Sequence, residues 1–284
     1  MRAFFLCLLV AVLTPALQAQ EFSGGFKAGL NFNRFEGPVE GVEGMDFESF
    51  NNSTGFHVGA TFALEFTDLV GLKLELIYSQ KGGEISYEGP GYVFLYSDND
   101  EQAFGAETRI IQSIVNSYLD FPLTAYYRLG PLELEGGANF GFLISSRGSG
   151  SARYTTQSSG VGELAFTYDA NFLGDRAGAG SIGRLADDLL PSGFRPPSLI
   201  GAYYNSDRDD SRYSRIDLGL VVGLSVYLNN GLYVAARYNH GLTDVTQPEN
   251  DLRKSELGSN NTRLFNEDDE DFNRSLQFSI GFRF

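Results

Sequence analysis

The side chains of this chain that could do chemistry are two histidines and a larger set of charged residues that recur at every second position. His57 and His240 could act as general bases in an acyl hydrolase. Such a site also needs a serine within hydrogen-bond distance and an orienting acid, and no G-x-S-x-G motif accompanies either histidine. We therefore expect no enzymatic activity and no catalytic residue.

The sequence gives no sign of a metal or cofactor site. The acidic run NEDDED at positions 266–271 could offer oxygen ligands to Ca²⁺ or Mg²⁺, but it lacks the D-x-[DN]-x-[DN]-G spacing of a calcium loop. The single cysteine, Cys7, lies in the N-terminal segment, which excludes disulfides, iron–sulfur clusters and cysteine-ligated zinc from the rest of the chain. We expect no cofactor, and a solvated acidic loop at 266–271.

The charged residues alternate with apolar ones along eight segments: 25–33, 55–66, 70–79, 115–128, 132–144, 216–228, 232–239 and 272–284. A period of two is typical of strands with one apolar and one polar face. In the last segment Leu276, Phe278, Ile280, Phe282 and Phe284 form the apolar face. Pro122 cannot donate a hydrogen bond to a neighbouring strand, so we expect a bulge there.

The connections between these segments alternate strictly between long and short. The long ones cover about 36–54, 81–113, 145–213 and 242–271, and the third contains positions 182–190, which could form a short helix. Outer-membrane barrels have an even number of strands, short periplasmic turns and long outer loops. The pattern predicts an all-β, eight-stranded antiparallel up-and-down transmembrane barrel with long extracellular loops, and it disfavours a soluble sandwich or lipocalin, which has no reason to sort its loops in this way.

In such a barrel the apolar faces contact lipid and the polar faces line the lumen. A basic group that faced lipid near the bilayer midplane would cost about 2–4 kcal/mol. Inside, opposite charges can pair, and eight strands leave an interior that side chains fill. We expect a polar network and no open pore; a proton or ion path is the alternative. The predicted lumen residues are Lys27, His57, Glu65, Lys73, Glu75, Asp120, Arg128, Glu133, Glu135, Asp217, Arg237 and Arg283.

The composition and the N-terminus agree with an exported protein. Residues 1–19 have a basic residue, a short apolar run and a small residue before position 20, the layout of a secretory signal peptide, so we expect the barrel to occupy 20–284. The 24 Phe and 15 Tyr residues suit an aromatic belt in a chain without Trp. The net charge of −15 argues against nucleic-acid binding. The predicted location is the bacterial outer membrane.

Four strings give this chain a family resemblance: FKAGLNFN at 26–33, LIYSQKG at 76–82, YLDFPLTAYY at 118–127 and RYNHGLTD at 237–244. With the Phe-terminated end, they resemble the PorT-like outer-membrane β-barrel family, which carries a proline similar to Pro122. The resemblance implies an eight-stranded outer-membrane barrel and no catalytic residue. The family's named member is associated with protein secretion and gliding, but function does not transfer on fold alone. The long connection at 145–213 departs from shorter relatives.

These observations predict a non-enzymatic outer-membrane protein with a structural or recognition role through its outer loops. The alternatives are a small-solute porin and an accessory component of a secretion machinery. The expected partners are the outer-membrane lipid, the outer-membrane insertion machinery and an extracellular or envelope protein bound by the loops. Phe284 resembles the terminal aromatic signal that the insertion machinery reads.

Overall fold

The computed structural model describes residues 21–284 except positions 43, 99, 157–161, 175, 178–180, 185–192, 196–210 and 230. The predicted signal peptide at 1–19 lies outside the described residues. No helix in the described part of the chain has the length and apolar character needed to cross a membrane.

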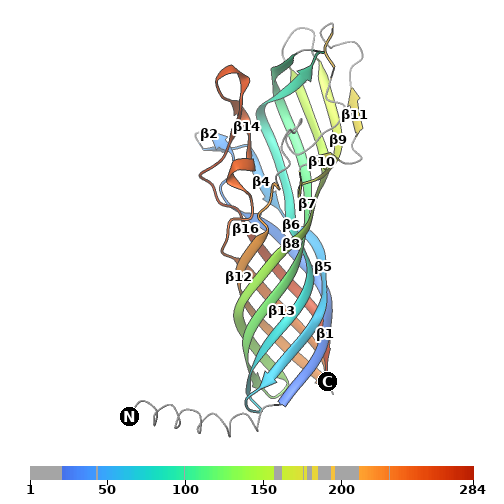
Figure 1. The fold of residues 1–284 in the computed structure, drawn as a ribbon, viewed down its shortest axis with the longest axis vertical. Coiled ribbons are helices and arrows are strands. Elements are labelled where there is room, and N and C mark those ends of the chain that lie inside the picture. Colours follow the sequence, from blue (N-terminus) through green and yellow to red (C-terminus); the bar gives the residue numbers. More distant parts are fainter. Residues whose placement is uncertain are drawn as a thin grey trace, which may run out of the picture.

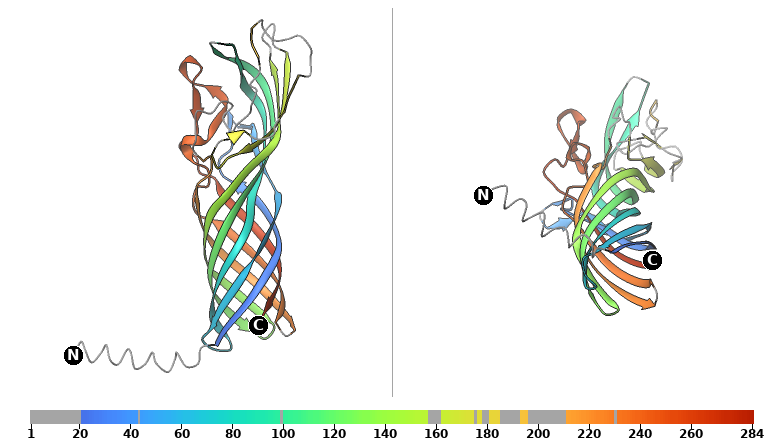
Figure 2. Two further views of the ribbon diagram at one scale, coloured as in Figure 1. Left: turned by 45° about the vertical axis from the view of Figure 1, so that its right-hand side comes forward. Right: turned by 60° about the horizontal axis from the view of Figure 1, so that its bottom comes forward.

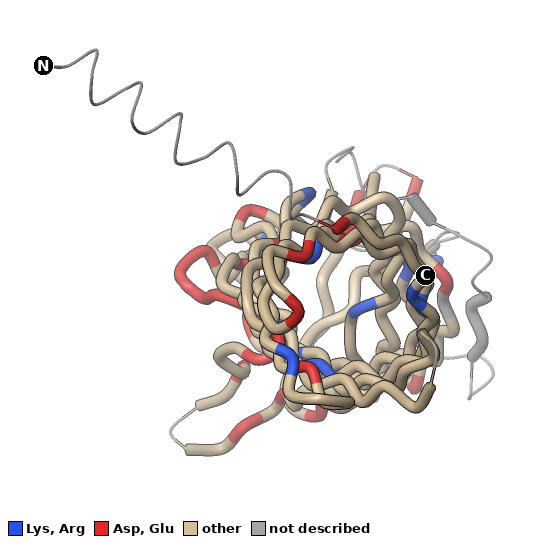
Figure 3. Tube along the Cα trace, turned by 90° about the horizontal axis from the view of Figure 1, so that it is seen from below, with Lys and Arg blue, Asp and Glu red and all other residues tan. Residues whose placement is uncertain are grey.

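Eight strands form one closed antiparallel barrel, as predicted (Figure 1). Each pairs with the next along the chain, and the last pairs with the first, so that the strands make a ring when they are seen along the barrel axis (Figure 3). The strands are β1 (Glu21–Glu36), β5 (Ser53–Glu65), β6 (Val70–Tyr96), β7 (Glu101–Leu129), β8 (Leu132–Thr156), β12 (Ile216–Asn229), β13 (Leu232–Gly241) and β16 (Phe272–Arg283).

The apolar face of each strand points outward and forms a belt around the barrel. Phe26, Leu74, Leu123, Leu220 and Ile280 are all exposed, while their polar neighbours along each strand point inward. An apolar surface of this extent is stable against lipid and not against water. At one end, here called the turn end, short turns join the strands, and Gly130 supplies the positive φ (60°) that the turn between β7 and β8 requires. The opposite end is called the loop end.

Three strands continue far beyond the barrel at the loop end, where the sequence suggested irregular loops. β6, β7 and β8 rise together as one sheet, and β9 (Glu163–Asn171), β10 (Arg176–Ala177) and β11 (Ser181–Arg184) extend it (Figures 1 and 2). One face of this extension packs in an apolar cluster that includes Val93, Leu95, Tyr154 and Phe166.

The prediction of loops is therefore wrong for positions 81–96 and 101–113, and for 145–156 and 163–171 within the third connection, all of which lie in strands. In β7 the exposed Glu107, Arg109 and Ile111 alternate with the buried Ala106, Thr108 and Gln112. The buried positions are partly polar there, and the run SSRGSGS at 145–151 has no apolar residue, which hid the strand pattern. The short helix predicted at 182–190 is also wrong for its first residues, since 182–184 lie in β11. Positions 185–190 lie outside the described residues.

The first and fourth connections, loop 1 and loop 4 below, lie side by side at the loop end (Figures 1 and 2). Loop 1 contains the β2–β3 hairpin, formed by β2 (Gly41–Val42) and β3 (Met45–Asp46), and β4 (Glu48–Asn51), which pairs with β6. Loop 4 contains β14 (Leu252–Leu257), β15 (Arg263–Phe265) and the two 3-10 turns Pro248–Asn250 and Ser259–Asn261. The long loops thus have structure of their own.

The bulge predicted at Pro122 is wrong. The pairing of β7 with β6 runs in one register from Tyr127 past Pro122 to Glu101, although the two pairs at Pro122 and Phe121 are missing from the ladder. On its other side β7 pairs Pro122 with Asn139, and the register shifts only between Ser117 and Tyr118. The proline therefore interrupts the hydrogen bonds to one neighbour without displacing the strand, because an extended backbone accommodates its φ.

Candidate functional site

The middle of the lumen holds a network of buried ion pairs. Lys73 Nζ lies 2.6 Å from Glu133 Oε1 and 2.8 Å from Glu135 Oε2. Arg237 connects two carboxylates: its Nε donates to Glu135 Oε1 at 2.8 Å and its Nη1 to Glu75 Oε2 at 2.5 Å. These five side chains are all buried. Each charge therefore has an opposite partner in a place where an unpaired charge would be strongly destabilising.

A second group of contacts fills the lumen at the turn end and is organised by Arg283. Its guanidinium pairs with Glu65 and, through Nη1 at 3.2 Å, with Glu133 Oε2. The guanidinium can only donate hydrogen bonds, and its Nη2 donates one to the Tyr126 hydroxyl at 3.0 Å. Arg128 Nη2 also lies 3.0 Å from Glu133 Oε2. Arg283 is thus turned inward toward acidic residues, and the penultimate residue of the chain ties four strands together.

A third group lies toward the loop end. Lys81 Nζ donates to Asp120 Oδ1 and to Asp217 Oδ2, both at 2.9 Å, and lies 4.7 Å from the centre of the Tyr118 ring.

One further cation, Lys27, completes the central network: its Nζ pairs with Glu75 Oε2 at 2.8 Å. The twelve charged groups of the lumen carry no net charge: Lys27, Lys73, Lys81, Arg128, Arg237 and Arg283 against Glu65, Glu75, Asp120, Glu133, Glu135 and Asp217.

His57 lies between the central network and the Lys81 group. Its Nδ1 is 2.6 Å from Asn31 Oδ1 and its Nε2 is 2.8 Å from Ser279 Oγ. Asn31 uses its Nδ2 to donate to Ser79 Oγ and the Gln80 carbonyl, so its Oδ1 accepts from His57 Nδ1–H, and Nε2 is left to accept from the serine hydroxyl. Serine, base and orienting amide stand in the order found in a serine hydrolase.

This Ser279–His57–Asn31 relay is enclosed by the barrel. The three residues are 6%, 1% and 0% exposed, in that order. A nucleophile acts only on a carbonyl that can approach it, and lumen side chains lie on both sides of this one along the barrel axis. His240 lies apart, half-buried at the end of β13 with its ring 6.2 Å from the Tyr238 ring. From this enclosure we expect the relay to orient polar groups inside the barrel, and we assign it no catalytic role.

A labelling experiment tests that assignment. We expect a fluorophosphonate probe to leave the folded wild-type protein unlabelled and ester substrates to be hydrolysed no faster than by Ser279→Ala or His57→Ala, because Ser279 is out of reach. Labelling that disappears in Ser279→Ala would show that the relay is accessible and would reverse the assignment. His240→Ala serves as the control for a histidine outside the relay.

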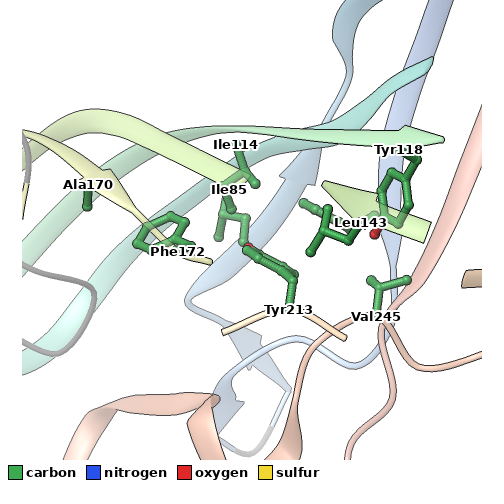
Figure 4. Close-up of a cluster of buried hydrophobic side chains, with 9 residues drawn as sticks. Ile85, Ile114, Tyr118, Leu143, Ala170, Phe172, Tyr213 and Val245 are labelled. Atoms are coloured by element: carbon green, nitrogen blue, oxygen red, sulfur yellow. The ribbon is translucent and has the colours of Figure 1, made fainter. Parts of the chain in front are cut away.

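An apolar cluster closes the lumen at the loop end. It is called the apolar cap here (Figure 4) and is formed by the buried side chains of Phe35, Ile85, Ile114, Tyr118, Leu143, Ala170, Phe172, Tyr213 and Val245. The Tyr213 ring stacks on Phe35, with ring centres 5.9 Å apart and planes at 5°. Backbone hydrogen bonds from Arg212 N to Phe172 O and from Ser214 N to Val245 O, both 2.8 Å, hold the loop residues of the cap in place.

All twelve predicted lumen residues lie within the barrel, and all except His57 take part in an ion pair there. The sequence reasoning missed Lys81, Asn31, Ser279 and the apolar cap. Lys81 continues the alternation of Lys73, Glu75 and Ser79, so the signal was present but was assigned to a loop. No group of three or more acidic, histidine or cysteine side chains in the described part of the chain is arranged to hold a metal ion.

The family model for the outer membrane protein beta-barrel domain matches residues 18–247. The chain belongs to this family. Membership places it in the bacterial outer membrane, in agreement with the closed barrel and its apolar belt. No curated protein matches the chain.

Several solved outer-membrane proteins are similar to this chain at low identity and low TM-score. Ail, the attachment invasion locus protein of Yersinia pestis, is 10% identical with a TM-score of 0.34, over 93% of this chain and 99% of that one. The outer membrane protease OmpT from Escherichia coli is 11% identical with a TM-score of 0.36, over 93% and 96%. Neisserial surface protein A is 12% identical with a TM-score of 0.30, over 93% and 97%. At such low identities and TM-scores, these similarities say nothing about the activity of this chain.

Proposed function

We propose that this protein is a non-conducting, non-enzymatic barrel that displays its loop end at the cell surface for recognition. The observation that carries the proposal is the filled lumen: three polar groups and the apolar cap occupy it in succession from the turn end to the loop end. A hydrated ion or solute would have to displace paired charges and apolar side chains together. The structured loops are then the part of the molecule that is free to bind.

Planar-bilayer recording of the refolded protein tests the first half of the proposal. We expect no steady current steps, because the ion pairs span the lumen from Arg283 to Lys81 and the cap lies beyond them. Regular channel openings in a preparation whose barrel is folded, as judged by heat-modifiable migration on a gel, would overturn it in favour of a small-solute porin.

A pull-down from intact envelopes tests the second half. A tag inserted in the third connection leaves loop 1 and loop 4 untouched, so a specific ligand of those loops should be retained and should be lost when both are shortened. The resemblance to PorT-like barrels supports a second candidate, an accessory role in secretion. That role predicts envelope proteins that remain bound after the loops are shortened.

The insertion machinery is a further proposed partner, through Phe284. The Phe284 side chain is exposed at the turn end, while its backbone exchanges hydrogen bonds with Gly24 at 2.8 and 3.1 Å. We expect deletion of Phe284 and Phe284→Ala both to lower the amount of heat-modifiable barrel in the outer membrane. Because Phe284→Ala keeps the backbone bonds, normal assembly of this variant alongside a failing deletion would show that strand closure, and not the aromatic ring, is what matters.

A further inference from the structure

The loop end carries most of the chain's excess negative charge. Residues 37–52 and 242–271 contain thirteen acidic and three basic residues, a net charge of −10 out of −15 for the whole chain. The basic residues are already paired: Arg253 with Glu256 and Arg263 with Glu101, each at 2.6 Å, and Lys254 with Glu48 at 2.8 Å. The excess is therefore carboxylate, and it is concentrated in two loops that lie side by side.

An apolar tip projects within this acidic region. Val42 and Met45 face each other across the β2–β3 hairpin and are 53% and 63% exposed, and Val39 beside them is also exposed. These side chains lie outside the lipid belt, on a loop that contains no basic residue. Exposed apolar side chains rimmed by charge are a common feature of surfaces that bind other proteins.

A groove of 320 Å³ runs from this tip to loop 4, lined among others by Val39, Val42, Pro90, Ser255, Asn266 and Asp269. Its two walls are tied to each other. The Glu40 carboxylate in loop 1 accepts hydrogen bonds from the backbone N–H groups of Lys254 and Ser255, at 2.9 and 3.0 Å, and from Ser255 Oγ at 2.8 Å. The groove is therefore formed in the free protein, which lowers the ordering cost of binding.

We propose that the acidic face, defined by Val39, Val42, Met45, Asp46 and residues 266–270, binds a basic protein segment that carries an apolar anchor residue. The proposal rests on the proposed recognition function and names the surface and the partner chemistry. The apolar anchor packs against Val42 in the groove and against Met45 beside it, and lysine or arginine side chains pair with the exposed carboxylates of Asp46, Glu267, Asp268 and Glu270.

Charge decides among the possible occupants. A nucleic acid, an acidic polysaccharide and an anionic lipid surface would all be repelled by a face with this excess of carboxylate. A second copy of the chain would present the same acidic face and be repelled as well. A basic segment gains from steering by the carboxylates and from burial of the apolar tip, so it is the occupant that both features favour.

Fluorescence anisotropy with the full-length protein in lipid nanodiscs tests the proposal. The probe is a labelled peptide of alternating leucine and lysine, and empty nanodiscs measure its binding to lipid. We expect specific binding that weakens as salt is added, because exposed charges are screened. A peptide with glutamate in place of lysine, and one with serine in place of leucine, should each bind much more weakly. Equal binding of all three peptides would overturn the proposal.

Two variants locate the binding surface. Val42→Ser combined with Met45→Ser should weaken binding on the order of tenfold, which is the effect of about 1.4 kcal/mol. Leu69→Ser and Asp68→Asn change an exposed apolar and an exposed acidic residue in the β5–β6 turn, at the opposite end of the barrel, and serve as matched controls that should leave affinity unchanged. If the control variants weaken binding as much as the tip variant, the acidic face is not the site.

The pH dependence gives a second readout. Burial and the charges of Asp251 and Asp271 raise the pKa of the Asp269 carboxyl to about 7, and burial and Asp251 do the same for the pKa of Asp271. The face gains negative charge as the pH rises through 7, so the leucine–lysine peptide should bind more tightly at pH 8 than at pH 6. Asp269→Asn should reduce that difference. The charged groups around Asp269 are Glu40, Glu48, Arg212, Asp251, Arg253, Lys254, Glu256 and Asp271.

The outcomes separate this inference from the proposed function. A loop-dependent ligand from envelopes that binds Val42→Ser/Met45→Ser as well as wild type would leave the recognition function standing and remove the acidic face as its site. Specific peptide binding by a barrel that also conducts would leave the face standing and remove the non-conducting scaffold.

Discussion

Arg237→Met is expected to destabilise the folded barrel by roughly 3–5 kcal/mol, because it leaves a buried carboxylate pair short of its main partner. Arg237 is the group that contacts both Glu75 and Glu135, which are themselves buried. Lys27 still pairs with Glu75 and Lys73 with Glu135, both at 2.8 Å, but Lys73 is shared with Glu133, so the buried lumen is left with one negative charge in excess. The loss in the free energy of unfolding is measured by urea unfolding of the protein refolded into lipid vesicles. Gel mobility and far-UV circular dichroism follow the unfolding.

An exposed ion pair of the same chemistry gives the control. Arg109 lies 3.7 Å from Glu88 on the sheet extension, where the two side chains are 63% and 76% exposed. Arg109→Met should therefore change stability by less than about 1 kcal/mol. Adding Glu135→Gln to Arg237→Met should recover part of the loss, since it removes the excess negative charge that the loss of Arg237 leaves in the lumen. Equal costs for Arg237→Met and Arg109→Met would show that the lumen is hydrated and that its ion pairs behave as surface pairs.

The barrel itself was predictable because one physical constraint acts on every strand. Lipid outside and a polar lumen inside impose a period of two, and a strand shifted by one residue would place its charged side chains in lipid. That constraint ends with the bilayer. Beyond it no lipid requires an apolar outer face on β6, β7 and β8, and one face packs in a local apolar cluster instead. The alternation is weaker there, so Lys81 and the strand residues that follow it could be mistaken for a loop.

The apolar cap could not be predicted for a different reason. Phe172, Tyr213 and Val245 come from connections without periodicity, and they meet Phe35 and Leu143 only after the chain has closed around the lumen. Nothing in their spacing reveals that they are neighbours. The acidic face could not be predicted for the same reason. The sequence shows two acidic loops, but only the fold brings them together, through the hydrogen bonds of Glu40.

The relay of Ser279, His57 and Asn31 shows how barrel closure creates contacts that no motif records. Gly29 of β1 pairs with Ser279 on one side and with His57 on the other. Because Gly29 has no side chain, His57 and Ser279 meet across it, and a Cβ at this position would lie 2.7 Å from His57 Cε1 and 1.9 Å from the Phe278 carbonyl oxygen. The glycine is thus required by close approach and not by its backbone angles.

Gly29→Ala is therefore expected to destabilise the barrel by about 3 kcal/mol, the upper part of the range for overpacking, because one of the two clashes is with backbone that cannot rotate away. It should also separate His57 from Ser279, which a changed His57 ring resonance in NMR spectra of the folded fraction would report. Urea unfolding in vesicles measures the stability.

Gly136→Ala is the matched control, since Gly136 lies on β8 and the nearest atom to its added Cβ is the Val221 carbonyl oxygen at 3.8 Å. There the substitution should be neutral or stabilising by up to about 1 kcal/mol, the cost of a glycine within a strand. If Gly29→Ala is as harmless as Gly136→Ala, then β1 and β16 can separate enough to admit a methyl group, and the lumen is looser than its ion-pair distances imply. If β1 and β16 separate this easily, the lumen can also widen enough to admit a solute. The stability of Gly29→Ala therefore also tests whether the filled lumen blocks conduction.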